Sequence, residues 1–161
     1  MTRTQYNECV DLYADGIYRF ILKNIRDDEI AKDVVQDTFL KVWEKVVDIS
    51  YEKAKTYFYT TAYHTMIDRI RKDKRMTRME DVHLPKSFHS NTYSDVMEVL
   101  EEGLKKLPEV QRSVVLLRDY EGYSYKEIGK IVDLTEAQVK VYIYRARLAL
   151  KKYIVDLDLV I

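Results

Sequence analysis

Glycine and proline are so scarce in this chain that the sequence leaves little room for a fold other than a helical one. The 161 residues include four glycines and two prolines. A fold rich in strands needs many turns, and these two residue types are the strongest turn formers. Apolar residues meanwhile recur at helical spacing, most clearly at Ala31, Val34, Val42 and Val46. We therefore expect an all-α protein.

One stretch breaks the helical pattern for long enough to separate two domains. Residues 76–94 are polar, contain Pro85 and lack an apolar period. We expect two small helical domains joined by a flexible linker: an N-terminal helical domain at 1–75, the linker at 76–94 and a C-terminal helix-turn-helix domain at 95–161. The expected helices cover about 8–25, 28–46 and 56–74 in the first domain, and about 94–107, 108–121, 125–132 and 135–154 in the second.

Charge is arranged in alternating blocks, although the 27 basic and 27 acidic residues cancel. Residues 1–52 hold seven basic and eleven acidic side chains, whereas residues 53–78 hold eight basic and two acidic ones. Residues 79–137 are acidic again, and residues 138–161 hold five basic and two acidic side chains. Phosphate groups respond to the local field rather than to the total. Both basic blocks therefore remain candidates for nucleic-acid contact.

The second basic block begins inside a predicted helix-turn-helix. Ser124 suits the cap of the first helix, and Thr135 with Gln138 fits a capping box at the start of the second. The small Gly129 lets the two helices approach closely. The second helix would enter the major groove. The alternative is a plain helical hairpin with a solvated basic face. Candidates for base contacts are Gln138, Lys140, Val141, Tyr142, Tyr144 and Arg145, and candidates for phosphate contacts are Arg147, Lys151 and Lys152.

The helix predicted at 56–74 combines aromatic and basic side chains. It begins with Tyr57, Phe58, Tyr59 and Tyr63 and ends in the basic run 69–75. Aromatic rings beside cations are a common means of holding unpaired bases. The alternatives are core packing for the rings, which we expect for two of the four, and a solvated helix face for the basic run.

No set of residues has the spacing of a catalytic or metal site. Asp33, Gln36 and Asp37 share one exposed helix face, but no third carboxylate or histidine falls at ligand spacing on that helix. The histidines lie in separate segments, and the single cysteine forms no metal motif. We expect no cofactor, no metal and no enzymatic activity. The lack of a membrane-length apolar run or a signal-peptide core predicts a cytoplasmic protein without membrane insertion.

Three segments together resemble a known family. They run from Asp28 to Trp43, from Tyr57 to Arg75 and from Leu107 to Lys152. They are similar to the extracytoplasmic-function sigma factors, the smallest class of the main sigma family of bacterial RNA polymerase. The first segment resembles the part that docks on the coiled coil of the polymerase β′ clamp. The second resembles the helix that helps open the minus-ten element, and the third resembles the domain that reads the minus-thirty-five element.

The resemblance implies a sigma factor that directs core RNA polymerase to specific promoters under the control of an anti-sigma factor. Its partners would be the β′ clamp and β subunits of core polymerase, promoter DNA and that anti-sigma factor. Asp33, Gln36 and Asp37 would contact the clamp, and the loop Asp48–Lys55 would hold a flipped-out base. Minus-ten contacts would come from Lys53, Lys55, Tyr59, Tyr63, Arg69, Arg71, Lys72 and Arg75, and minus-thirty-five contacts from Gln138, Lys140, Tyr144, Arg145, Arg147 and Lys151.

The chain departs from the family pattern in three places. Tyr63 and His64 stand where arginine and asparagine are usual. Val141 and Tyr142 replace more polar or basic residues. Asp133 occupies a turn position that glycine often holds, and aspartate tolerates the left-handed backbone that such a turn requires.

Two other functions each fit part of the sequence. An autonomous regulator that dimerises on a palindrome would use the same helix-turn-helix, but it would leave the face of Asp33, Gln36 and Asp37 without a role. An adaptor that binds only proteins would leave both basic blocks without a role. DNA binding in the absence of polymerase separates the first of these functions from that of a sigma factor.

Overall fold

The computed structural model describes residues 1–80 and 92–158, with side chains described for 1–77 and 97–156. Helices joined by short connections make up these two stretches, and neither stretch contains a strand. The prediction of an all-α fold is confirmed.

The first two helices begin at local capping signals. Helix α1 (Arg3–Ile25) starts earlier than the apolar pattern predicts, because Thr2 and Gln5 form a capping box. Asp27 caps helix α2 (Asp28–Glu44) by accepting a hydrogen bond from the amide of Ile30 at 3.1 Å. The short 3₁₀ turns η1 (Val46–Asp48) and η2 (Tyr51–Lys53) lead into helix α3 (Ala54–Glu80).

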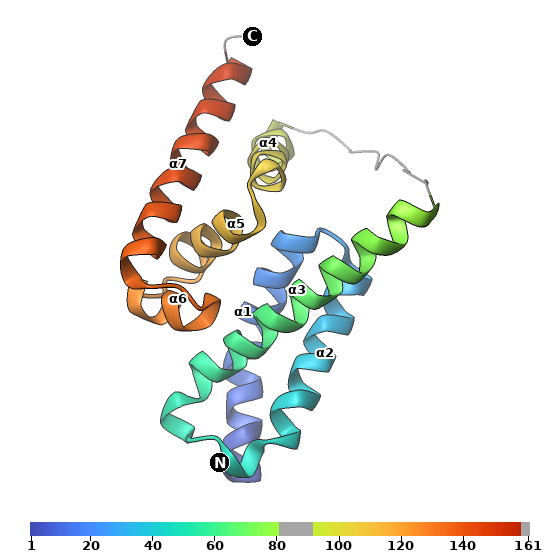
Figure 1. The fold of residues 1–161 in the computed structure, drawn as a ribbon, viewed down its shortest axis with the longest axis vertical. Coiled ribbons are helices and arrows are strands. Elements are labelled where there is room, and N and C mark those ends of the chain that lie inside the picture. The colour runs from blue at the N-terminus through green and yellow to red at the C-terminus, as the bar shows by residue number, and fades with distance from the viewer. Residues whose placement is uncertain (81–91, 159–161) are drawn as a thin grey trace.

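Helices α1, α2 and α3 form a three-helix bundle with an apolar core (Figure 1). Phe58 of α3 is fully buried at its centre and lies against the rings of Tyr6, Tyr13 and Phe39. This cluster fixes α2 and α3 side by side, so that their outer faces point to solvent. Fully or almost fully buried around it are Ile17, Phe20, Ile21, Ala31, Val34, Val42, Ala62 and Met66.

Residues 92–158 hold the remaining described helices, and the turns at Ser124 and Asp133 follow the sequence prediction closely. Ser124 caps the helix that follows it, and Asp133 takes the left-handed conformation with φ 59°. Both features agree with the predicted helix-turn-helix. The elements are α4 (Thr92–Lys106), α5 (Glu109–Val115), a π-helical turn η3 (Leu116–Tyr120), α6 (Tyr125–Val132) and α7 (Glu136–Asp158).

The two halves pack against each other, α3 against α6 and α1 against α4, α5 and η3 (Figure 1). Helix α3 continues past the expected boundary at Arg75 to Glu80, and α4 begins at Thr92. The rest of the expected linker, 81–91, lies outside the described residues. The division into domains at 1–75 and 95–161 stays a prediction, and we refer to residues 1–80 as the N-terminal half and to residues 92–158 as the C-terminal half.

Candidate nucleic-acid interface

The polar triad of α2 lies on one exposed face of that helix, as its spacing predicts. Asp33, Gln36 and Asp37 are exposed, whereas the opposite side of α2 is buried in the bundle. The structure adds Leu40, which is 60% exposed and follows Gln36 and Asp37 by one helical turn. We define the α2 face as Asp33, Gln36, Asp37 and Leu40. Sequence reasoning missed Leu40, although an apolar residue outside the buried stripe was the available signal.

Both candidate minus-ten tyrosines are buried in this conformation. Tyr59 is 3% exposed and Tyr63 is 6% exposed. The ring of Tyr59 packs edge-on against Tyr123 of the C-terminal half, with centroids 4.8 Å apart. Burial raises the pKa of Tyr59 to about 12 and also raises the pKa of Tyr63. With Phe58, three of the four aromatic residues are buried rather than the expected two, because the second half supplies a cover that the helix pattern does not contain.

The basic residues of α3 differ in how they are held. Arg69 is partly buried, with Nε 3.2 Å from Asp73 and Nη1 3.9 Å from Asp33. The cations of Arg71, Lys72 and Arg75 are exposed on the last turns of the described helix. Lys53 and Lys55 are exposed at its start, and Lys55 Nζ lies 4.3 Å from the centroid of the Tyr123 ring. The structure thus places the basic candidates at both ends of α3 rather than in one cluster.

A recess of about 300 Å³ opens between the end of α2 and the first half of α3. It brings cations, hydroxyl groups and an aromatic ring together, and Lys41 Nζ donates to Thr65 Oγ1 at 3.1 Å inside it. Such a mixture suits an unpaired base and its phosphate. Sequence reasoning missed this recess because its residues come from two helices and no motif joins them. Its lining is Lys41, Glu44, Lys45, Tyr57, Thr60, Thr61, His64 and Thr65.

The helix-turn-helix is closed by a tight contact at Gly129. A Cβ atom built at this position would lie 2.6 Å from the carbonyl oxygen of Leu134 in the turn. The capping box of α7 is present, with the amide of Gln138 donating to Thr135 Oγ1 at 3.1 Å and the amide of Thr135 donating to Gln138 Oε1 at 2.9 Å. The predicted close approach therefore occurs between α6 and the turn that begins α7.

The candidate side chains of α7 project from its exposed side, but not all are equally available. Arg147 makes a two-point ion pair with Asp119, at 3.1 and 2.5 Å, and this pairing raises the pKa of Arg147. Lys140 lies 3.9 Å from Glu136 in an exposed pair that is easily exchanged. Arg145 and Lys151 make no ion pair within the described residues. The exposed candidates are Gln138, Lys140, Val141, Tyr144, Arg145, Arg147, Lys151 and Lys152, whereas Tyr142 is half-buried.

The contact between the halves contains polar bonds that the sequence did not predict. The guanidinium of Arg19 pairs with Glu121 at 2.9 and 2.7 Å, and the side chain of Glu121 is only 4% exposed. Nε of the buried Arg112 donates to Asn24 Oδ1 at 2.9 Å. We call the Arg19–Glu121 pair, the Arg112–Asn24 bond and the ring contact between Tyr59 and Tyr123 the clasp. Its partners are between 64 and 102 positions apart in sequence, so no local pattern indicates them.

Neither a metal cluster nor a membrane span is found in the part of the chain that the structure describes. Among the described residues, no three His, Cys, Asp or Glu side chains gather in a way that would hold a metal ion. The described helices also lack the combination of length and apolar character that crossing a membrane requires.

Comparison with known proteins identifies both halves. The model "Sigma-70 region 2" matches residues 9–76, and the model "Sigma-70, region 4" matches residues 97–150. RNA polymerase sigma factor YlaC of Bacillus subtilis is 30% identical over 151 residues, covering 87% of this chain and 86% of its own. The ECF RNA polymerase sigma factor SigM of the same organism is 28% identical over 150 residues, covering 90% of this chain and 92% of its own.

Solved structures agree on the fold. The sigma factor RpoE in complex with the anti-sigma factor NepR from Bartonella quintana has a TM-score of 0.80 at 23% identity, covering 92% of this chain and 96% of its own. CnrH in complex with the cytosolic domain of CnrY has a TM-score of 0.75 at 21% identity, covering 98% and 91%. Together with the sequence matches over both halves, these findings mean that the chain belongs to the sigma-70 family of RNA polymerase sigma factors, in its extracytoplasmic-function class.

Proposed function

We propose that this chain directs core RNA polymerase to specific promoters, with the α2 face as its docking surface on the polymerase clamp. The observation that carries the proposal is this face itself, where Leu40 is exposed beside Asp33, Gln36 and Asp37 while the opposite side of α2 is packed in the bundle. An exposed apolar side chain framed by polar ones is typical of a protein-binding site. An autonomous regulator would leave it unused.

Two separated DNA contacts would complete the function. The exposed side of α7 would read the minus-thirty-five element through Gln138, Lys140, Tyr144 and Arg145, with Arg147 and Lys151 on phosphate. Linking two weak contacts in one chain raises the overall affinity through effective concentration. The minus-ten element would be handled by Lys53, Lys55, Tyr59, Tyr63, Arg69, Arg71, Lys72 and Arg75.

The burial of Tyr59 and Tyr63 gives the proposal a conformational requirement. Both rings are buried, and Tyr59 packs against Tyr123 of the C-terminal half, so Tyr59 can meet an unpaired base only after the halves separate. Docking on polymerase would supply the energy for this separation, because it holds the halves at two distant positions on the promoter. The free chain would then bind minus-ten DNA poorly.

An anti-sigma protein is the proposed regulator. The solved relatives RpoE and CnrH are each bound to another protein, NepR in the first case and CnrY in the second. We propose that a comparable partner holds this chain away from polymerase, and that the chain acts in the cytoplasm together with polymerase and promoter. The work of the chain would be binding rather than catalysis.

Charge reversal on the α2 face tests the docking role. Asp37→Lys should weaken binding to core polymerase at least tenfold, because it removes an anion from the centre of the contact and adds a repelling cation. Asp11→Lys makes the same charge change on an exposed part of α1 and is the matched control. Binding is measured by titrating labelled chain with core, and helical content by circular dichroism. Equal affinity for both variants would contradict the docking role.

Transcription and promoter-protection assays with the original chain and Asp37→Lys distinguish a sigma factor from an autonomous DNA-binding regulator. Run-off transcription with core polymerase should depend on the added chain and should be impaired by Asp37→Lys. The free chain should not protect the promoter by itself at the concentration that suffices for the holoenzyme. Full promoter protection by the free chain, unaltered by Asp37→Lys, would instead support an autonomous regulator.

A further inference from the structure

The outermost line of the recognition helix α7 is apolar in its first turns. Val139, Ile143 and Ala146 face the core, and Ala137 and Val141 lie on the opposite side. Val141 is 46% exposed. The solvent side of an amphipathic helix is normally polar, so an apolar line there needs an occupant. No such occupant is present among the described residues, because α7 packs on α4, α5 and α6 with its other side.

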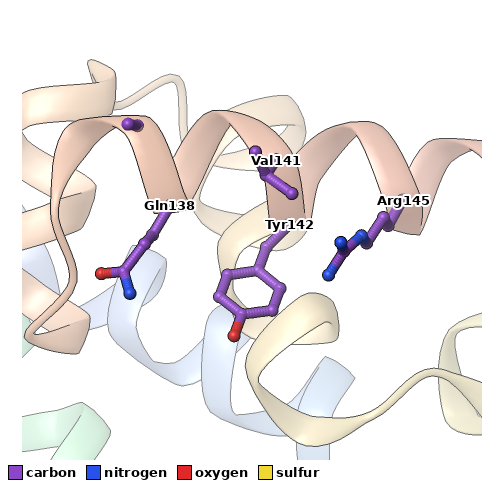
Figure 2. Close-up of a pocket in the computed structure, with 5 residues that line it drawn as sticks. Gln138, Val141, Tyr142 and Arg145 are labelled. Atoms are coloured by element: carbon purple, nitrogen blue, oxygen red, sulfur yellow. The ribbon is translucent and has the colours of Figure 1, made fainter.

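A shallow recess of about 250 Å³ lies along this line. Its lining consists of Ala137, Gln138, Val141, Tyr142 and Arg145. Figure 2 shows the side chains of Gln138, Tyr142 and Arg145 projecting from the same side of α7, with Val141 between them. The recess therefore has an apolar floor, with an amide at one end and a guanidinium at the other.

The capping box limits what Gln138 can offer to a base. Its Oε1 accepts hydrogen bonds from the amide of Thr135 at 2.9 Å and from Thr135 Oγ1 at 3.2 Å. The two-point contact of glutamine with adenine needs both the oxygen and the nitrogen of the amide. With Oε1 engaged, Gln138 presents only Nε2, which is a hydrogen-bond donor. Its natural partner is a single acceptor beside the apolar floor.

One base edge in the major groove combines these two properties. Thymine carries the acceptor O4 next to its C5 methyl group, whereas cytosine carries a donor and both purines lack an apolar group there. The exposed cations Arg145, Lys151 and Lys152 on the same helix favour the surrounding phosphates. The chemistry of the recess therefore matches a thymine in duplex DNA.

We infer that the recess formed by Ala137 and Val141 receives the 5-methyl group of one thymine in the upstream promoter element, while Gln138 Nε2 donates to its O4. This inference rests on the proposed reading of duplex DNA by α7 and names the base that it reads. Val141 is then a specificity-determining residue. Val141 stands where the family has more polar or basic residues, and its apolar side chain would contact the methyl group that only thymine carries.

Replacement of thymine by uracil tests the inference, because it removes the methyl group and leaves O4 in place. Holoenzyme made from this chain and core polymerase first selects its upstream element from a randomised duplex. Each thymine of the selected element is then replaced singly by deoxyuridine, and binding is measured by competition. We expect one position at which uracil weakens binding about fourfold, the value of one buried methyl-sized group.

Variants connect that position to Val141. Holoenzyme with Val141→Ala should bind the thymine element about as weakly as the original binds the uracil element, and uracil should then cost nothing further. Leu148→Ala is the matched control, since Leu148 is 49% exposed and lies about two turns further along α7. It should keep the full response to uracil. Val141→Thr keeps the branched shape and should keep a reduced response.

The outcomes separate this inference from the function on which it rests. If the holoenzyme selects no upstream sequence, the proposed reading of duplex DNA by α7 is wrong. If it selects one but no uracil replacement weakens binding, the thymine contact is overturned and the proposed function stands. A uracil effect of equal size in the original and in Val141→Ala would likewise overturn the role of Val141.

Discussion

Arg112 is a buried charge whose side chain donates to a neutral acceptor, Asn24, while the charge of Glu109 favours its charged form. Its Nε donates to Asn24 Oδ1 at 2.9 Å, and Ser113 Oγ donates to the same oxygen at 3.3 Å. Asn24 Nδ2 in turn donates to the carbonyl oxygen of Phe20 at 3.0 Å. Burial lowers the pKa of Arg112, yet a guanidinium stays charged at all ordinary pH values. Asn24 thus supplies the hydrogen-bond acceptor that helps to stabilise this buried cation between the halves.

Removal of this partner should destabilise the protein. Asn24→Ala leaves the guanidinium of Arg112 without its acceptor, and we expect the free energy of unfolding to fall by about 1.5–3 kcal/mol. Arg112→Leu combined with Asn24→Ala should cost less than the sum of the single changes, because the unpaired charge is then absent. Urea denaturation of the single and double variants measures both quantities. Strict additivity of the two changes would contradict a coupling between them.

At the scale of single residues, the caps and turns that the sequence predicted correctly are those that depend on neighbouring residues along the chain. Thr135 with Gln138, Ser124 and Asp133 were all assigned correctly, since their partners lie within a few residues. Asn24 and Arg112 are 88 positions apart, and polar residues at such positions carry no local signal of pairing. The recess beside Lys41 was missed for a related reason, because it forms only where two helices pack, whereas Leu40 could have been found as an apolar residue outside the buried stripe of α2.

At the scale of elements, the helix-turn-helix depends on a contact that leaves no room for a side chain. A Cβ atom at Gly129 would lie 2.6 Å from the Leu134 carbonyl oxygen, and backbone cannot move as easily as the end of a side chain. The sequence predicted the helices well because capping and apolar spacing are local properties. It did not predict the η1, η2 and π-helical turns, whose geometry is set by the segments packed around them.

Substitution of this glycine should therefore loosen the helix-turn-helix. Gly129→Ala should lower the free energy of unfolding by about 1–3 kcal/mol through overpacking, and it should weaken upstream DNA binding by the holoenzyme. Gly103→Ala is the matched control, because a Cβ there meets the side chains of Leu150 and Tyr153 at 3.0 Å, and these can shift. Alanine also has the higher helix propensity. Equal losses in chemical denaturation would contradict the special role of Gly129.

At the scale of the whole molecule, the arrangement of the halves follows from specific pairs rather than from the charge blocks. The alternating blocks would favour contact between the basic end of α3 and the acidic segment 79–137. The pairs in the structure instead use Arg19 and Arg26 from the acidic block 1–52, with Arg26 Nη1 2.9 Å from Glu102. Net charge over a segment does not predict which side chains meet once the helices have packed. The fold of each half was thus predictable, and their contact was not.

Opening of the clasp should expose Tyr59, one of the two minus-ten tyrosines, in the free chain. Glu121→Arg replaces an almost fully buried carboxylate by a cation beside Arg19, so the halves should separate. We expect a larger radius of gyration in small-angle scattering and tighter binding of a single-stranded minus-ten oligonucleotide, by about tenfold. That gain should disappear in Glu121→Arg combined with Tyr59→Ala, because the ring uncovered by opening is then missing.

Two further variants test whether the contact between the halves, rather than a change of charge, keeps Tyr59 from single-stranded DNA. Asp156→Arg makes the same charge change at an exposed position near the end of α7 and should alter neither the radius nor the binding of the oligonucleotide. Arg19→Glu combined with Glu121→Arg reverses the pair and should restore both the compact form and the weak binding of the oligonucleotide. A change of charge alone would raise binding in the Asp156 variant as well. If Glu121→Arg stays compact, or opens without gaining affinity for the single strand, the clasp does not keep Tyr59 from DNA.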